Sequence, residues 1–171
     1  MTEQKMNSDF AILYRTNSQS RSLEEALRKL NIPYRIYGGT SFYQRKEIKD
    51  ILAYLRLVLN HRDEEALKRV INYPARGIGK TSMDRVAQIA ANYDKSMWEV
   101  IENAHQFPEL KNAISKLRDF VNMINSFTIL KDQQNTYDIA MHVARSVNLL
   151  KLLNEDKTIE GISKYENVVE L

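Results

Sequence analysis

The chain has 171 residues, of which 43% are hydrophobic and none is cysteine, and its net charge is +3. That length accommodates one domain, or a small domain with part of another, and the composition is that of a globular chain with a core. The lack of cysteine excludes a disulfide framework and a thiolate metal site. No apolar run approaches the roughly 18 residues that span a bilayer, and residues 1–8 are too polar for a signal peptide. We therefore expect a soluble cytoplasmic protein with no membrane partner.

Basic side chains are concentrated in the first half of the chain. Residues 15–85 contain 15 basic and 8 acidic residues, whereas residues 86–171 contain 9 basic and 12 acidic residues. Such a basic half is typical of a surface that contacts a polyanion. A solvated helical surface with a chance asymmetry gives the same counts, so charge alone leaves both interpretations open.

The N-terminal part predicts a short disordered lead-in over residues 1–8 and then a β-α-β unit over residues 9–37. Residues 10–14 (FAILY) form an apolar run that is typical of a buried strand. Apolar residues then recur at helical spacing until Pro33 forbids continuation, and residues 34–37 (YRIY) alternate as a second strand would. Because two strands do not form a stable sheet alone, we expect this unit to belong to a larger sheet.

From residue 38 onward the pattern changes to helices alone. Apolar residues recur at intervals of three and four, as they do on one face of an amphipathic helix. Helices are predicted around the apolar stripes at residues 48–59, 66–71, 83–90, 97–101, 110–124, 139–147 and 159–169. Pro74 ends the second helix, Pro108 precedes the fifth, and Asn135 or Thr136 caps the sixth. The predicted fold class is therefore mainly α, a bundle-like domain preceded by the short β-α-β segment.

The clearest local motif lies between the second and third of these helices. It reads Arg76, Gly77, Ile78, Gly79, Lys80 and Thr81. The two glycines let the backbone turn and approach a ligand closely, and the amides that open the next helix attract a phosphate. With basic side chains nearby, this layout predicts a helix-hairpin-helix that holds a nucleic-acid backbone without reading bases. An ordinary turn between helices is the plainer interpretation.

The same residues do not fit an ATP-binding loop. A Walker A loop follows a strand and has a glycine five residues before its Gly-Lys-Ser/Thr tail. Here Gly79, Lys80 and Thr81 supply the tail, but Pro74 stands at the earlier position and a helix precedes it. We therefore predict no ATP site in this loop.

Two other clusters are candidate DNA contacts. Arg15 and Asn17 follow the first predicted strand, where α/β sheets bind ligands, although both residues also suit a cap of the next helix. The other cluster comprises Tyr43, Arg45, Lys46 and Lys49. Aromatic rings among basic groups can stack on bases and hold phosphates. The alternative is that the neighbouring Phe42 anchors its helix to the core while the charges are solvated.

No catalytic or metal-binding constellation is predicted. His61, His105 and His142 are far apart and have no partner at helical spacing. The adjacent carboxylates of Glu24-Glu25 and Glu64-Glu65 point in different directions on a helix, so they do not form a dyad. We expect neither a catalytic residue nor a metal ion.

Several segments occur in a recognisable order and spacing. They are residues 11–21 (AILYRTNSQSR), 23–27 (LEEAL), 32–39 (IPYRIYGG), 42–43 (FY), 45–50 (RKEIKD), 53–56 (AYLR) and 76–79 (RGIG), with Asn72 and Pro74. Together they resemble the UvrD/PcrA/Rep family of superfamily 1 DNA helicases over residues 9 to about 85. Residues 158–160 (TIE) and 165–171 (YENVVEL) are similar to a later helix of the family.

The resemblance implies a placement in a larger enzyme. Residues 9–37 would open the second RecA-like domain, 2A, and residues 38–171 would form the first part of the helical 2B domain. The loop at residues 76–81 would contact duplex DNA, and Arg15 and Asn17 would lie along the single-strand track. The parent protein would be an ATP-dependent 3′-to-5′ DNA helicase of the bacterial nucleoid. It would use ATP and Mg²⁺ in DNA repair or replication.

For this chain itself the resemblance implies DNA binding and regulation of the motor. No Walker A loop, acidic Walker B strand or arginine finger is found, so we expect no cofactor and no ATP hydrolysis here. The expected partners are a single-strand/duplex DNA junction, the remaining helicase domains and repair proteins. The alternative is a protein–protein interaction module that binds no DNA. Salt separates the two, because phosphate-backbone binding weakens steeply as salt rises.

Overall fold

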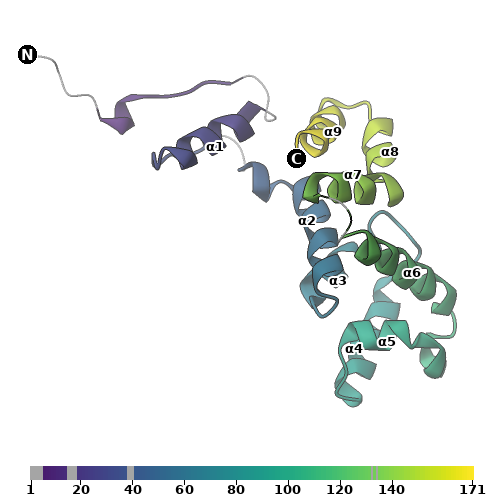
Figure 1. Cartoon of the computed structure of the whole chain (residues 1–171). Helices are drawn as coiled ribbons and strands as arrows, with labels where there is room; N and C mark the ends of the chain where they lie inside the picture. The colour runs from purple at the N-terminus through teal and green to yellow at the C-terminus, as the bar shows by residue number, and fades with distance from the viewer. Residues whose placement is uncertain (1–5, 15–18, 38–40, 132, 134) are drawn as a thin grey trace, which may run out of the picture. The chain divides into compact units, whose positions relative to one another are not determined.

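The computed structural model describes residues 6–14, 19–37, 41–131, 133 and 135–171. All regular structure in these ranges is helical (Figure 1). The α-helices are α1 (Ser20–Lys29), α2 (Lys46–Leu59), α3 (Glu64–Val70), α4 (Lys80–Asn92), α5 (Met97–Glu102), α6 (Ile114–Leu130), α7 (Thr136–Ser146), α8 (Leu149–Glu155) and α9 (Ile159–Glu170). Short 3₁₀ turns are η1 (Asn7–Asp9), η3 (Phe42–Gln44), η4 (Ala104–Gln106) and η5 (Pro108–Leu110). The prediction of a mainly α chain is confirmed.

The two strands predicted at residues 10–14 and 34–37 are not formed, although the helix between them is present as α1. Neither segment has a strand partner among the described residues, and Leu13 is 94% exposed where a buried strand was expected. The physical reason is that a strand is stabilised by a neighbouring ladder and a covered face. An apolar run without either stays irregular.

The chain forms two compact units. Unit 1 comprises Met1–Lys49 and Leu153–Leu171, and unit 2 comprises Asp50–Leu152. The division falls within α2 and within α8. The expected domain boundary after residue 37 does not coincide with it, because unit 1 also contains η3, the start of α2 and all of α9.

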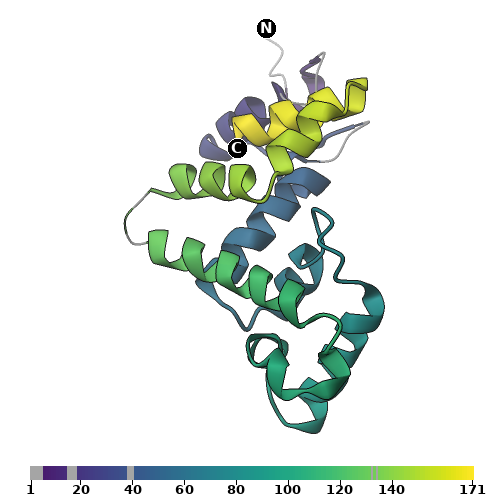
Figure 2. The same cartoon turned by 90° about the vertical axis from the view of Figure 1, so that its right-hand side faces the viewer.

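The core of unit 2 is built from apolar faces of α2 to α7. In it, α5 packs against α3, α4 and α6, and α6 packs against α7 (Figure 2). The largest fully buried side chains of the unit are Tyr54, Phe120, Phe127, Ile51, Leu57, Leu67, Ile71, Ile78, Met97 and Ile101. Most of these side chains lie in the stripes predicted from sequence, whereas Ile78 belongs to the loop before α4 and Phe127 lies beyond the predicted stripe of α6. One helix start differs: α6 begins at Ile114, because 3₁₀ turn η5 uses Pro108 in its first turn and Lys111–Ala113 forms a further turn.

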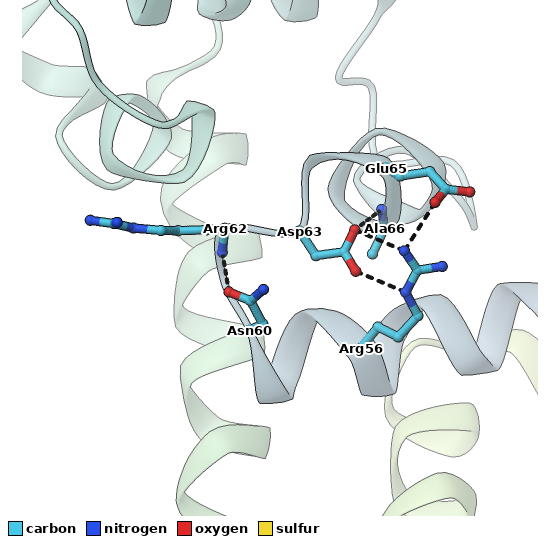
Figure 3. A network of polar contacts seen from close by, with 6 residues as sticks. All are labelled: Arg56, Asn60, Arg62, Asp63, Glu65 and Ala66. Atoms are coloured by element: carbon cyan, nitrogen blue, oxygen red, sulfur yellow. Dashed lines mark hydrogen bonds and ion pairs between the residues drawn. The ribbon is translucent and has the colours of Figure 1, made fainter.

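Local capping defines where the helices of unit 2 begin. Asp63 Oδ1 accepts a hydrogen bond from Ala66 N at 2.9 Å and so caps α3. The same carboxylate accepts hydrogen bonds from Nε and Nη2 of Arg56, at 2.8 and 3.1 Å, as Figure 3 shows. Arg56 also reaches Glu65 at 3.0 Å, while Asn60 Oδ1 accepts from the backbone N of Arg62. These hydrogen bonds fix the α2–α3 turn. The hydrogen bond from Ala66, together with those from Arg56, lowers the pKa of Asp63.

Candidate nucleic-acid interface

The loop that joins α3 to α4 in unit 2 is shaped by one side chain. Asn72 Oδ1 accepts hydrogen bonds from two loop amides, Arg76 N at 2.9 Å and Ile78 N at 3.1 Å. Gly77, between them, has φ +69°, a left-handed conformation that glycine adopts without a steric penalty. Asn72 and Gly77 therefore bend the chain into a tight turn directly before α4.

The turn presents backbone to solvent on one side and is anchored on the other. Ile78 is only 1% exposed, so its side chain fixes the loop to the core of unit 2. Gly77, Gly79, Lys80 and Thr81 are all exposed. Gly79 is the N-cap of α4 and, because it has no side chain, provides no cap hydrogen bond to the first turn of this helix. The amides that open α4 therefore face outward, in the geometry that helix N-termini offer to an anion.

Space around the two glycines differs. A side chain at Gly79 would meet nothing within 4 Å, whereas a Cβ at Gly77 would lie 2.6 Å from Lys116 Nζ. An incoming ligand can therefore reach the backbone at Gly79. At Gly77 the space above the loop is taken by a lysine of α6.

Arg76 has a different environment from the other residues of the motif. Its guanidinium donates to the carbonyls of Val70 and Pro74, at 3.0 and 3.2 Å, and to the hydroxyl of Tyr54 at 2.7 Å. It also lies over the rings of Tyr54 and Phe120. The side chain expected to add charge for a phosphate is thus bonded to the protein, and its evident role is to hold the loop against α2, α3 and α6.

Tyr54 completes this anchor, and the sequence alone did not indicate it as part of the site. Its hydroxyl, on α2, donates its one hydrogen to the carbonyl oxygen of Tyr73, lies 3.3 Å from that of Val70, and accepts from Arg76. Burial raises the pKa of Tyr54 to about 12, although the Arg76 guanidinium acts in the opposite direction. The phenol therefore stays protonated and remains a hydrogen-bond donor at any physiological pH.

The predicted cluster at Tyr43, Arg45, Lys46 and Lys49 lies in unit 1 and is divided by burial. Arg45 is 7% exposed and donates to Asn167 Oδ1 and to Ser20 Oγ, both at 2.7 Å. Burial lowers the pKa of Arg45 and the neighbouring Glu47 and Glu24 raise it. Tyr43 is half-buried, with the Arg28 guanidinium 5.7 Å from its ring centroid, while Lys46 is exposed and Lys49 half-buried. Arg45 therefore holds unit 1 together, and the two lysines carry the exposed charge of this cluster.

The partners of Arg45 belong to a buried polar network. Glu24 of α1 accepts from Ser20, Ser41, Tyr34 and the backbone N of Phe42. Burial raises the pKa of Glu24, but these four hydrogen bonds outweigh it and bring the pKa below its ordinary value. Asn167 of α9 donates to Glu47 at 2.6 Å. The network joins α1, η3, α2 and α9 within unit 1.

Arg15 and Asn17, predicted to lie on the single-strand track, fall outside the described residues. The three histidines are separate: His61 stacks on Trp98, His142 packs edge-on to Phe127, and His105 is exposed. No group of three or more metal-ligating side chains occurs in the described ranges. Likewise, within those ranges, none of the helices has the length and apolar character needed to cross a bilayer.

Comparison with known proteins gives a consistent result. Residues 1–168 match the UvrD-like helicase C-terminal domain. The chain is 40% identical over 169 residues to the ATP-dependent DNA helicase PcrA of Bacillus subtilis, which covers 99% of this chain and 23% of that protein. It is 38% identical over 168 residues to PcrA of Staphylococcus aureus, with 97% and 23% covered. It is 40% identical over 167 residues to DNA helicase II of Salmonella typhimurium, with 94% and 22% covered.

The chain thus spans less than a quarter of the length of these relatives. The match nevertheless extends over both units, from the N-terminal segment through α9. The resemblance carried by the segments between residues 9 and 85 is therefore confirmed, and the chain belongs to the UvrD-like helicase C-terminal domain family.

Proposed function

We propose that this chain is the duplex-binding and motor-regulating part of an ATP-dependent 3′-to-5′ DNA helicase. The observation that carries the proposal is the exposed backbone of Gly79, Lys80 and Thr81 at the uncapped start of α4. Relatives named as ATP-dependent DNA helicases support the substrate class. In this proposal α3, the loop and α4 act as a helix-hairpin-helix.

The mode of binding follows from the groups that the loop presents. Backbone amides and the Lys80 ammonium are donors suited to phosphate oxygens, whereas the planar guanidinium of Arg76 is bonded within the protein and the side-chain oxygen of Asn72 is bonded to two loop amides. Such contacts position a duplex and carry no sequence information. We infer binding that is independent of DNA sequence and sensitive to salt.

The nucleotide of the proposed parent enzyme does not fit this loop. The element before the loop is helix α3, not a strand, and Pro74 occupies the position where a Walker A loop needs its first glycine. The described residues also hold no carboxylate cluster for Mg²⁺. We therefore assign no nucleotide chemistry to these residues, and the proposed parent would bind ATP and Mg²⁺ through other residues.

The domain placement is part of the same proposal. Residues 9–37 would belong to a RecA-like 2A domain, in whose sheet the segments at 10–14 and 34–37 would find strand partners. Residues 38–171 would belong to domain 2B. The candidate single-strand contacts Arg15 and Asn17 would lie in the 2A part, with Lys46 and Lys49 as further DNA contacts. Among the wider partners would be the remaining helicase domains, repair proteins and the nucleoid.

A protein-interaction role is the second candidate, and a specific observation favours it. In unit 1, Phe10, Ile12 and Leu13 are 67%, 52% and 94% exposed within one short segment, and a run of exposed apolar side chains is a candidate surface for another protein. Association of this kind depends on apolar burial and responds weakly to salt. It is compatible with DNA binding by unit 2.

The test is fluorescence anisotropy of the 171-residue chain with a labelled duplex carrying a 3′ single-stranded tail, titrated with salt. We expect Lys80→Ala to weaken binding and to lower the slope of log K against log salt by about 0.9, one phosphate contact. The matched control is Lys95→Ala, an exposed lysine beyond the other end of α4, about 20 Å away. Equal binding by the two variants, or no binding by the unmodified chain at low salt, would overturn the proposal in favour of the interaction module.

A further inference from the structure

Lys116 approaches the α3–α4 loop from a part of the chain 39 residues away. It lies on the first turn of α6, and its ammonium donates a hydrogen bond to the carbonyl oxygen of Gly77 at 3.0 Å. The two residues belong to the same unit. The loop therefore has a second basic group beside it that local sequence does not provide.

Gly77 makes this approach sterically possible. A Cβ at that position would lie 2.6 Å from Lys116 Nζ and 3.2 Å from Cε, closer than packed atoms tolerate. Its φ of +69° also lies in the left-handed region that glycine adopts without strain. Gly77 thus serves two purposes, the left-handed turn and the space for the lysine.

The Lys116 ammonium has donors left for a ligand. An ammonium carries three N–H groups, and the contact with Gly77 uses one of them. The residue is exposed and forms no ion pair with a carboxylate in the part of the chain that the structure describes. A cation held by a carbonyl and not neutralised by an acid is available to an anion that arrives at the same loop.

We propose that Lys116 is a DNA-contacting residue of the α3–α4 loop, which binds a phosphate of the duplex beside the one held at the start of α4. The inference rests on the proposed function, because it supplies a second contact to the same ligand. In place of Arg76, whose guanidinium is bonded to Val70, Pro74 and Tyr54, Lys116 provides the second positive charge. The site is then made by α4 and α6 together.

A purely structural role for Lys116, in which it only braces the loop, makes a different prediction. Lys116→Gln keeps an N–H donor for the Gly77 carbonyl but removes the charge, whereas Lys116→Arg keeps the charge. If Lys116 binds phosphate, Lys116→Gln weakens duplex binding about three- to tenfold at low salt and lowers the salt slope by about 0.9. Lys116→Arg then retains both the affinity and the salt slope of the unmodified chain. If Lys116 only braces the loop, Lys116→Gln behaves like the unmodified chain.

The experiment is the same anisotropy titration with the whole chain, with Lys95→Gln as the charge-matched control and thermal melting to compare the folding of all variants. If the salt slope of Lys116→Gln is unchanged while Lys80→Ala still binds the duplex more weakly, this inference is overturned and the proposed function stays intact. Absence of binding by the unmodified chain at low salt overturns the proposed function, and this inference with it. The inference is supported if Lys116→Gln binds the duplex more weakly, Lys116→Arg binds it like the unmodified chain, and Lys95→Gln shows no change.

Discussion

Arg76 and Lys80 show that equal charge within one motif can serve different purposes. They are four residues apart, yet the Arg76 guanidinium is bonded to two backbone carbonyls and a phenol, while Lys80 is exposed at the first position of α4. The planar guanidinium suits the first role, because its fixed fork serves several acceptors at once. The compact, mobile ammonium of lysine suits a phosphate in solvent.

Arg76→Ala is therefore expected to destabilise unit 2 by about 2–3 kcal/mol, since it removes the partly buried hydrogen bonds to Val70, Pro74 and Tyr54 together with two ring contacts. Arg76→Lys should recover little, because one ammonium cannot reproduce the fork. Urea denaturation measures the free energy of unfolding, with Arg85→Ala as an exposed control whose guanidinium donates to the Glu109 carbonyl at 3.0 Å. A stability equal to that of the control would mean that Arg76 does not anchor the loop.

At the scale of elements, helical periodicity in the sequence was a good guide and strand patterns were not. α2 forms over the predicted apolar stripe, although Leu59 at its end is 72% exposed. Of the two predicted caps of α7, Asn135 or Thr136, Asn135 is the one found, and its Oδ1 accepts from Asp138 N. Both features have local causes. A strand depends on a neighbour that local sequence does not encode, so the strand predicted at residues 10–14 is not formed in this chain. The same reason explains the site: the loop at residues 76–81 was recognisable, but its contacts with Tyr54 and Lys116 come from distant segments.

His61 connects elements that are far apart in sequence. In the α2–α3 turn, it stacks on Trp98 of α5 with ring centroids 4.2 Å apart, and its Nε2 lies 3.2 Å from Thr128 Oγ1 of α6. Burial lowers the pKa of His61, Lys131 lowers it further, and Glu102 acts in the opposite direction. The folded state therefore favours the neutral ring.

The sign of the pH dependence follows from this lowered pKa. Above the ordinary histidine pKa of about 6.5 the ring is neutral in both states and its contribution to stability is fully present. As pH falls through the lower folded pKa, protonation favours the unfolded chain and the contribution is lost. Denaturation at pH 8 and pH 5.5 measures how much unfolding free energy is lost on acidification. This loss should be smaller for His61→Phe, which cannot titrate, than for the unmodified chain. Equal losses would assign the effect to other groups.

At the scale of the whole chain, each of the two units is stabilised by a different kind of interior. Unit 2 has a continuous apolar core, whereas unit 1 combines a few buried apolar residues with the Glu24–Arg45–Asn167 network. Buried polar groups are costly unless every member is satisfied, and no buried side-chain nitrogen or oxygen among the described residues lacks a partner. Unit 1 is therefore expected to depend strongly on single polar side chains.

Glu24→Ala tests that dependence. It leaves the donors of Ser20, Ser41 and the Phe42 backbone without their acceptor, which should cost about 2–3 kcal/mol within unit 1. Amide hydrogen exchange should then show lost protection in α1 and α9 and unchanged protection in α4 to α6, because those three helices belong to unit 2. Glu166→Ala, which removes the same charge from an exposed position of α9, should leave amide protection unchanged in both units. Uniform loss across both units would mean that they unfold together, and no loss in α9 would mean that the network does not extend from Glu24 to Asn167.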